Sequence, residues 1–246
     1  MITQKQPLSK EIIVEVKKNY SLIAHGGLHN SSYQRNSIEA LELALVKGYG
    51  ISTEIRLFED ELVIQNETFN KPLPLSLLLT IWEKTTDLEL ALKVKMDGLA
   101  PMLNEVFSQY SLRNDFFFYG MSTTEELIYE NNLLPLAYGL SEREPIIRFK
   151  SLPSRIWLDS LMPMELLAVL SEEGREKVLK QTYFLSSEIY KKDPTTLWEA
   201  INKLNFRGIA TEHPQLLSSK LSLTHNYNLG TILNRQDEDM KLNPFE

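Results

Sequence analysis

The sequence contains no cysteine. Disulfides, thiol nucleophiles and thiolate metal ligands are therefore excluded from its chemistry. The sequence also lacks any run of the ~20 apolar residues that a membrane-spanning helix requires. Residues 1–20 show no charged start followed by an apolar stretch, which is the pattern of a secretory signal. We therefore expect a cytoplasmic protein without a membrane span.

Basic side chains are in the minority. Lys and Arg number 26 against 33 Asp and Glu, which gives a formal net charge of −7. An acidic chain with scattered basic residues matches nucleic-acid-binding proteins poorly, so no nucleic-acid partner is expected. The 246 residues, of which 43% are hydrophobic, are enough to bury one large core. The sequence leaves the oligomeric state open.

Short apolar runs alternate with helical stretches along the chain. Strands are predicted at 22–25, 50–58, 61–66, 88–96, 115–120, 134–141, 155–161, 182–187 and 206–213. Helices are predicted at 37–48, 98–112, 123–131, 163–174 and 194–204. About eight such units favour an α/β fold with a single (β/α)8 barrel over an open doubly wound sheet. We expect one domain over 1–246, with an N-terminal helix at 9–19, the barrel at about 20–220 and a C-terminal tail at 225–246.

Several segments together resemble the glycerophosphodiester phosphodiesterase family. They are AHGG (24–27), QRNSIEALELAL (34–45), STEIRLFEDELVIQNETF (52–69), LALKVKMDGL (90–99) and FRGIATEHPQLL (206–217). The resemblance implies a TIM barrel of the phospholipase-C-like phosphodiesterase type. The segments KGYGISTEIRLFEDELVIQNE, KPLPLSLLL, SEREP and WLD look like the branch of this family that is often encoded in bacterial surface-polysaccharide clusters.

The family resemblance implies a defined chemistry. Acidic side chains hold a divalent cation, Mg²⁺ or Ca²⁺, and the cation polarises the phosphodiester. Two histidines act as general acid and base. Transferred to this sequence, the resemblance identifies His25 as the first catalytic histidine. Gly26 stands where the family has an arginine, and Arg35 stands where it has a glutamate.

The metal positions depart from the family pattern as well. Ser52 stands at the first metal carboxylate and Glu54 at the second, while Lys93 falls at the third or within one residue of it. The second catalytic histidine falls on Gln65 or Asn66. Glu54 is therefore a metal ligand only if a metal is bound, and a lysine ammonium repels a second cation. No cofactor is expected, with Mg²⁺ or Ca²⁺ required only if the family chemistry survives.

Polar residues alternate on two of the predicted strands. Ser52, Glu54 and Arg56 share one face of the first, and Lys93 and Lys95 share one face of the second. In a barrel this polar face points inward, and its carboxyl end lies at the barrel mouth. Two interpretations stay open for these charges. They form a structural ion network, or they form an anion pocket in which lysine replaces the positive charge of the metal.

Further candidates lie on later strands. Trp157 and Asp159 share one strand face, and Trp157 either packs in the core or stacks on a sugar ring. Ser187 and Glu188 follow a strand and are expected at the mouth. The predicted ligand-binding residues are Arg56, Asn66, Lys93, Lys95, Trp157 and Glu188, with His25 as the residual catalytic group.

These residues predict a degenerate family member. Its function would be that of a binding or accessory protein in surface-polysaccharide or glycerophosphate metabolism, with a phosphate or sugar phosphate as its ligand. The alternatives are an active phosphoric diester hydrolase with a rearranged site, a metal-independent lyase or transferase that uses His25 and Lys93, and a structural partner protein. Whether the protein is an enzyme stays open at this point.

Overall fold

The polar residues at the end of the first strand depend for their position on how the strands pair. The computed structural model describes residues 20–31, 33–64, 72–85, 87–110, 115–145 and 151–221. The predicted helix 9–19, the tail 225–246 and the candidate site residue Asn66 lie outside the described residues. Within the described ranges, no helix is long and apolar enough to cross a membrane.

Strands and helices alternate along the chain, as the sequence predicts. The first half of the chain contains β1 (Ser21–His25), α1 (Ile38–Val46), β2 (Gly50–Phe58), β3 (Glu61–Ile64), β4 (Leu73–Pro74), α2 (Leu75–Trp82), β5 (Leu90–Val94), α3 (Ala100–Ser108), β6 (Phe116–Tyr119) and α4 (Thr123–Asn131). The second half contains β7 (Tyr138–Leu140), β8 (Ile156–Leu158), α5 (Pro163–Ala168), α6 (Glu172–Leu179), β9 (Thr182–Leu185), the 3₁₀ helix η2 (Ser187–Tyr190), α7 (Thr195–Ile201), β10 (Gly208–Thr211) and α8 (Pro214–Lys220).

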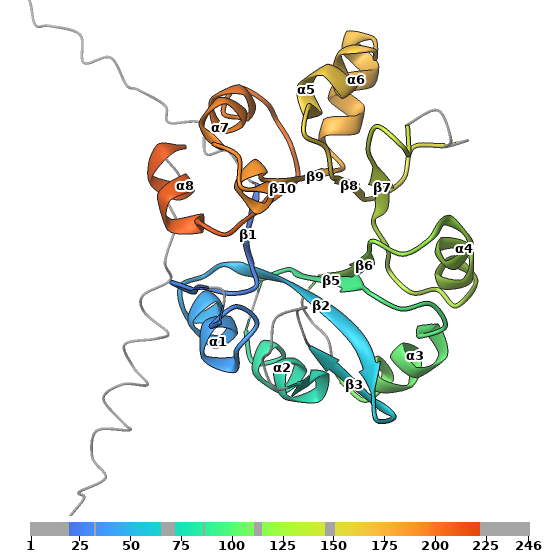
Figure 1. The fold of residues 1–246 in the computed structure, drawn as a ribbon. Coiled ribbons are helices and arrows are strands. Elements are labelled where there is room, and N and C mark those ends of the chain that lie inside the picture. Colours follow the sequence, from blue (N-terminus) through green and yellow to red (C-terminus); the bar gives the residue numbers. More distant parts are fainter. Residues whose placement is uncertain are drawn as a thin grey trace, which may run out of the picture.

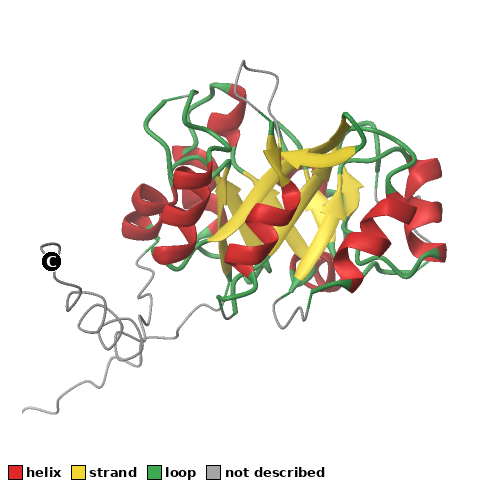
Figure 2. Ribbon diagram, turned by 90° about the horizontal axis from the view of Figure 1, so that it is seen from below, coloured by secondary structure: helices red, strands yellow, loops and turns green. Residues whose placement is uncertain are grey.

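The strands form one curled sheet of mostly parallel pairs. Its order runs β4-β3-β2-β1-β10-β9-β8-β7, while β5 pairs with β2 and with β6. The first and last strands, β1 and β10, are parallel neighbours. Figure 1 shows the strands around a common centre with the helices outside, and Figure 2 shows the molecule from below, with helices flanking the strands. The fold is therefore an α/β fold of the TIM-barrel-like kind.

Two separate apolar layers follow from the period of two along each strand. Inward side chains of several strands pack together inside the curled sheet, and the large ones among them include four aromatic residues. This inner layer is made by Ile23, Ala91, Phe117, Tyr119, Ala137, Trp157, Tyr183, Leu185 and Ala210. The alternate residues of the same strands, such as Leu22, Leu92 and Phe118, pack outward in the core that the helices cover.

The amino ends of the strands are tied together by charged side chains. The Arg207 guanidinium donates to the Tyr183 hydroxyl at 2.7 Å and to the Asp115 carboxylate at 3.0 Å. Arg155 also donates to Asp115, and the Tyr183 hydroxyl donates to Glu89. These groups precede or begin their strands, so they lie at the edge of the sheet opposite His25. We expect them to support the fold rather than to bind a ligand.

One predicted helix is in fact two. The sequence predicts a continuous helix at 163–174, but the chain leaves the helical conformation after α5 and begins α6 at Glu172. The reason is a local cap, because the Ser171 hydroxyl accepts a hydrogen bond from the Gly174 backbone N–H at 3.2 Å. Serine side chains favour this N-cap role over a position in the middle of a helix.

Candidate functional site

The candidate site lies where the parallel strands end. His25 is the last residue of β1, and it is paired in register with Ser52 of β2. Two residues further along β2, Glu54 is paired in register with Lys93 of β5. Tyr119 is the last residue of β6 and is paired with Lys93. Because parallel strands end at the same edge of the sheet, these side chains share one end of the molecule, the barrel mouth.

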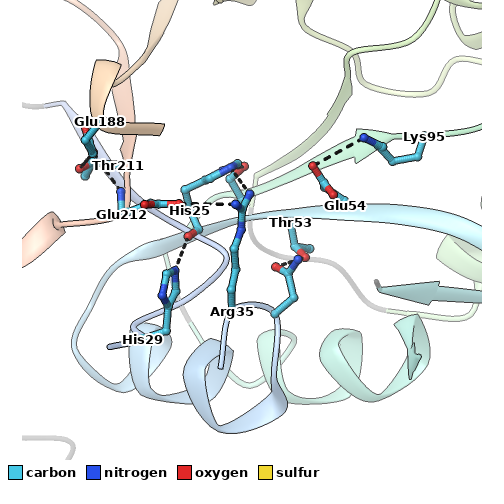
Figure 3. A network of polar contacts seen from close by, with 11 residues as sticks. His25, His29, Arg35, Thr53, Glu54, Lys95, Glu188, Thr211 and Glu212 are labelled. Atoms are coloured by element: carbon cyan, nitrogen blue, oxygen red, sulfur yellow. Dashed lines mark hydrogen bonds and ion pairs between the residues drawn. The ribbon is translucent and has the colours of Figure 1, made fainter. Parts of the chain in front are cut away.

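His25 is held by hydrogen bonds on both ring nitrogens (Figure 3). Arg35 Nη2 lies 2.6 Å from His25 Nε2, and His25 Nδ1 lies 3.1 Å from Ser52 Oγ. A guanidinium can only donate, so Nε2 accepts and the ring proton is on Nδ1. Ser52 Oγ lies a further 2.8 Å from the Tyr119 hydroxyl. We call these four residues, His25, Arg35, Ser52 and Tyr119, the strand-end cluster.

The environment of His25 favours its neutral form. The side chain is 4% exposed, and burial lowers its pKa well below the ordinary value of 6.5. The positive charges of Arg35 and Lys93, and then His29, lower the pKa of His25 further. A neutral imidazole whose lone pair is already bonded to a guanidinium is not free to remove a proton from a substrate.

This pKa makes a prediction for stability. The unfolded chain binds a proton at His25 below about pH 6.5, whereas the folded protein resists that proton, so folding stability is lost as the pH falls below 6.5. We expect His25→Gln to make the decline in unfolding free energy shallower by up to about 1.4 kcal/mol per pH unit. Urea unfolding at pH values about one unit apart, between 7.5 and 5.5, gives the slope of unfolding free energy against pH for the wild type and for His25→Gln. His29, whose pKa burial also lowers, keeps part of the decline in the variant. Equal slopes in the wild type and in His25→Gln would contradict a lowered pKa of His25 in the folded protein.

Arg35 reaches His25 because Gly26 has no side chain. Gly26 has a φ of +74°, and a Cβ built there would lie 2.4 Å from Arg35 Cγ. The Arg35 side chain thus occupies the space beside the backbone of Gly26. Its second terminal nitrogen, Nη1, lies 3.5 Å from Glu212 Oε1, and both side chains are about a quarter exposed. The guanidinium therefore bridges the segments that follow β1 and β10 (Figure 3).

The charges on β2 and β5 include one ion pair. Glu54 Oε1 lies 3.9 Å from Lys95 Nζ, and the Glu54 side chain is almost buried. Lys93 passes beside Gly120, whose added Cβ would lie 3.0 Å from Lys93 Cγ. Its positive charge lowers the pKa of His25 and opposes the rise that burial causes in the pKa of Asp159. The Lys93 ammonium therefore influences both His25 at the end of β1 and Asp159 after β8.

The side chains at the family's metal positions do not fit a divalent cation. Ser52 Oγ is bonded to two protein groups, Glu54 is paired with Lys95, and the third position is the Lys93 ammonium. Across the ranges that the structure describes, no group of three or more His, Asp or Glu side chains is placed to hold a metal ion. Mg²⁺ and Ca²⁺ need several oxygen ligands, which this arrangement does not supply.

The remaining predicted residues have different surroundings. Glu188 accepts hydrogen bonds from the hydroxyls of Ser186 and Thr211 and from the Glu212 backbone N–H, so its carboxylate joins the ends of β9 and β10. Trp157 is 2% exposed and stacks on Tyr119 with 3.9 Å between ring centroids, which matches the packing interpretation. A ligand role for either residue stays a prediction.

Arg56 lies on β2 beyond Glu54, at the point where β2 pairs with the antiparallel strand β3. Its side chain is partly buried. The structure thus brings Glu54 and Lys95 together. It places Arg56 on the same strand face, further from His25, and its ligand role also stays a prediction.

Three residues of the site were not among those selected from the sequence. Arg35 counted only as a departure from the family motif, and neither Tyr119 nor Glu212 was selected. The sequence does carry a signal for Tyr119, because the alternation in FFFY places it on the inner face at the end of a strand. No comparable signal indicates that Arg35, in an irregular loop, reaches His25.

Comparison with known proteins places this geometry on a known fold. No protein-family model matches the chain, and no curated protein matches it significantly. Among solved structures, it is similar to a glycerophosphodiester phosphodiesterase from Parabacteroides distasonis, with a TM-score of 0.62 and 18% identity. The similarity covers 84% of this chain and 98% of that one. At this identity the likeness concerns the fold: the chain has the barrel-like α/β fold seen in that glycerophosphodiester phosphodiesterase.

Proposed function

We propose that the protein is a degenerate relative of the glycerophosphodiester phosphodiesterases that binds a phosphate or sugar phosphate at the barrel mouth without a metal. It does not carry out the metal-dependent, two-histidine hydrolysis of that family. We place it in bacterial surface-polysaccharide or glycerophosphate metabolism, in the cytoplasm, as a binding or accessory protein. The motifs retained around a replaced site support this assignment.

The observation that carries the proposal is the pair of cations beside His25. Arg35 contacts His25 directly, and Lys93 is close enough to lower its pKa. Within the described residues, Lys93 lies within 4.0 Å of no carboxylate, whereas Lys95 is paired with Glu54. A guanidinium and an ammonium at one strand edge are the groups that proteins use to hold phosphate oxygens.

The same contacts argue against hydrolysis by the family route. A general base needs a free lone pair, and His25 Nε2 already accepts from Arg35 at 2.6 Å. The Nδ1 proton is directed at Ser52, inside the sheet. The alternative, an active phosphoric diester hydrolase with a rearranged site, requires a second acid–base group in place of the histidine whose position falls on Gln65 or Asn66.

We also infer that the sheet closes into a complete (β/α)8 barrel. The inference is supported at the one junction where no two named strands pair, between β6 and the residues before β7. Phe118 N–H donates to the Pro135 carbonyl at 2.9 Å, and Ala137 N–H donates to the Phe118 carbonyl at 2.8 Å. These bonds form a parallel bridge from Phe118 to Leu136.

Titration calorimetry of the full chain with inorganic phosphate and with glycerol 3-phosphate tests the proposed function. We expect both to bind in the presence of a chelator, with an affinity that added Mg²⁺ or Ca²⁺ does not increase. Binding should weaken as salt rises, because the attraction is between charges. Binding that requires a divalent cation would contradict the proposal, as would the absence of binding by both compounds.

A further inference from the structure

We propose that Arg35 is a cap on His25 that a bound oxyanion displaces, so that anion binding and proton uptake at His25 are linked. This inference rests on the proposed function and adds a coupling that the family resemblance does not contain. It concerns what the Arg35 guanidinium does in the free protein and where it goes when a ligand arrives.

The cap is built from a short contact and a weaker anchor. Arg35 Nη2 lies 2.6 Å from His25 Nε2, while the ion pair from Nη1 to Glu212 is 3.5 Å long. Of these two contacts, one is to a neutral ring and the other joins atoms 3.5 Å apart. A phosphate or sulfate offers the guanidinium two charged oxygens in the geometry that it prefers. The ligand therefore competes well for the fork of Arg35.

Displacement of the cap changes the charge preference of His25. The free protein holds the ring neutral through burial and through the charges of Arg35 and Lys93. A dianion placed among these groups cancels their repulsion and leaves Nε2 without its donor. One proton then passes from solvent to Nε2, which donates it in a hydrogen bond to a ligand oxygen, while the proton on Nδ1 stays hydrogen-bonded to Ser52 Oγ. No covalent bond to the ligand forms or breaks.

Other charged groups come close to His25 or to its neighbours from several elements. His29 and Arg35 from the loop after β1 and Lys93 on β5 act on His25 directly. Glu54 on β2 and Asp159 after β8 act on Tyr119 of β6, Glu212 after β10 pairs with Arg35, and Glu188 on η2 accepts from the Glu212 backbone N–H. Glu54 is paired with Lys95, and both Glu188 oxygens accept protein hydrogen bonds. His29 also titrates, so the readout must identify His25 individually.

Nuclear magnetic resonance of the full chain with ¹⁵N-labelled histidine provides that readout. The sequence has four histidines, which single substitutions to glutamine assign. Sulfate is the probe, because it remains a dianion near neutral pH and adds no titration of its own. In the free protein at about pH 6.5 we expect neutral His25 with its proton on Nδ1. With sulfate at the same pH, both ring nitrogens should carry protons.

Linkage sets the size of the effect on binding. Uptake of one proton makes the sulfate affinity rise by up to about tenfold for each pH unit of acidification. Calorimetry at several pH values measures this slope in the wild type and in His25→Gln. His25→Gln should still bind sulfate, but its sulfate affinity should rise less on acidification than that of the wild type.

Substitution of Arg35 tests the cap without any ligand. In Arg35→Met the His25 pKa should rise toward 6.5, whereas the matched change Arg143→Met, at an exposed side chain, should leave it unchanged. Arg35→Lys provides a second variant that keeps the charge but loses the fork. An unchanged His25 pKa in folded Arg35→Met would overturn the cap.

The outcomes separate this inference from the proposed function. Sulfate that binds while His25 stays neutral with its proton on Nδ1 would overturn the linkage and leave the anion site standing. No binding of sulfate or phosphate at any pH would overturn both. Binding with protonation of His25 and a lost slope in His25→Gln supports both.

Discussion

Trp157→Ala is expected to lower the free energy of unfolding by about 3–5 kcal/mol, the cost of removing a large buried aromatic side chain. The indole lies in the inner layer of the sheet. Its ring centroid lies 3.9 Å from that of Tyr119, 6.0 Å from that of Phe117 and 6.3 Å from that of Tyr183. Hydrogen-bonded strands surround this layer, so the neighbours cannot close the cavity by a small shift of one helix. Urea unfolding measures the loss.

The control is Val169→Ala, because Val169 is 79% exposed and its truncation should change stability by less than about 0.5 kcal/mol. Trp157→Phe keeps most of the apolar volume and should cost less than Trp157→Ala. A small stability change in Trp157→Ala, together with a large loss of sugar-phosphate affinity, would contradict the packing role. That result would restore the sugar-stacking interpretation of Trp157.

Lys93→Met is expected to weaken phosphate binding by about 10- to 100-fold. The figure corresponds to the ~1.5–3 kcal/mol of a hydrogen bond to a charged group. Methionine retains most of the apolar stem that passes Gly120 and removes only the ammonium. Calorimetry with inorganic phosphate in chelator gives the affinity, and urea unfolding verifies that the variant remains folded.

Lys180→Met is the matched control, because Lys180 is an exposed lysine that pairs with Glu176 on α6. It should bind phosphate as the wild type does. The structural-network interpretation of Lys93 makes the opposite prediction for Lys93→Met, namely reduced stability with unchanged phosphate affinity. The two interpretations thus differ in which quantity changes, and one pair of measurements distinguishes them.

The period-two pattern of the strands accounts for most of what could be predicted. It predicts the 50–58 strand with its inner face of Ser52 and Glu54, and it predicts Lys93 on the neighbouring strand. Short-range signals also give the 123–131 helix, which matches α4 residue for residue. Helix α2 was not predicted, although its buried residues Leu75, Leu78, Leu79 and Trp82 recur at helical spacing. Its start carries no side-chain cap, and Leu77 interrupts the polar face that Ser76 and Thr80 form.

The contacts within the site depend on information that no local pattern carries. The His25 to Arg35 contact requires the loop after β1 to turn back, with positive φ at Gly26 and at Asn36. The Ser52 to Tyr119 contact joins residues 67 positions apart on strands that are not adjacent. Alternation places each side chain on the inner face, but only the completed sheet determines which of them touch.

The most direct test of the metal-free site is a hydrolysis assay of the purified protein with glycerophosphodiesters and with a chromogenic diester. Each substrate is measured with Mg²⁺, with Ca²⁺ and with chelator. His25→Ala is measured beside the wild type under each condition. We predict no turnover under any of these conditions, because Arg35 covers His25 and Lys93 replaces a metal ligand. Turnover that requires both the metal and His25 would contradict this prediction, because the site would then retain the family's metal-dependent chemistry.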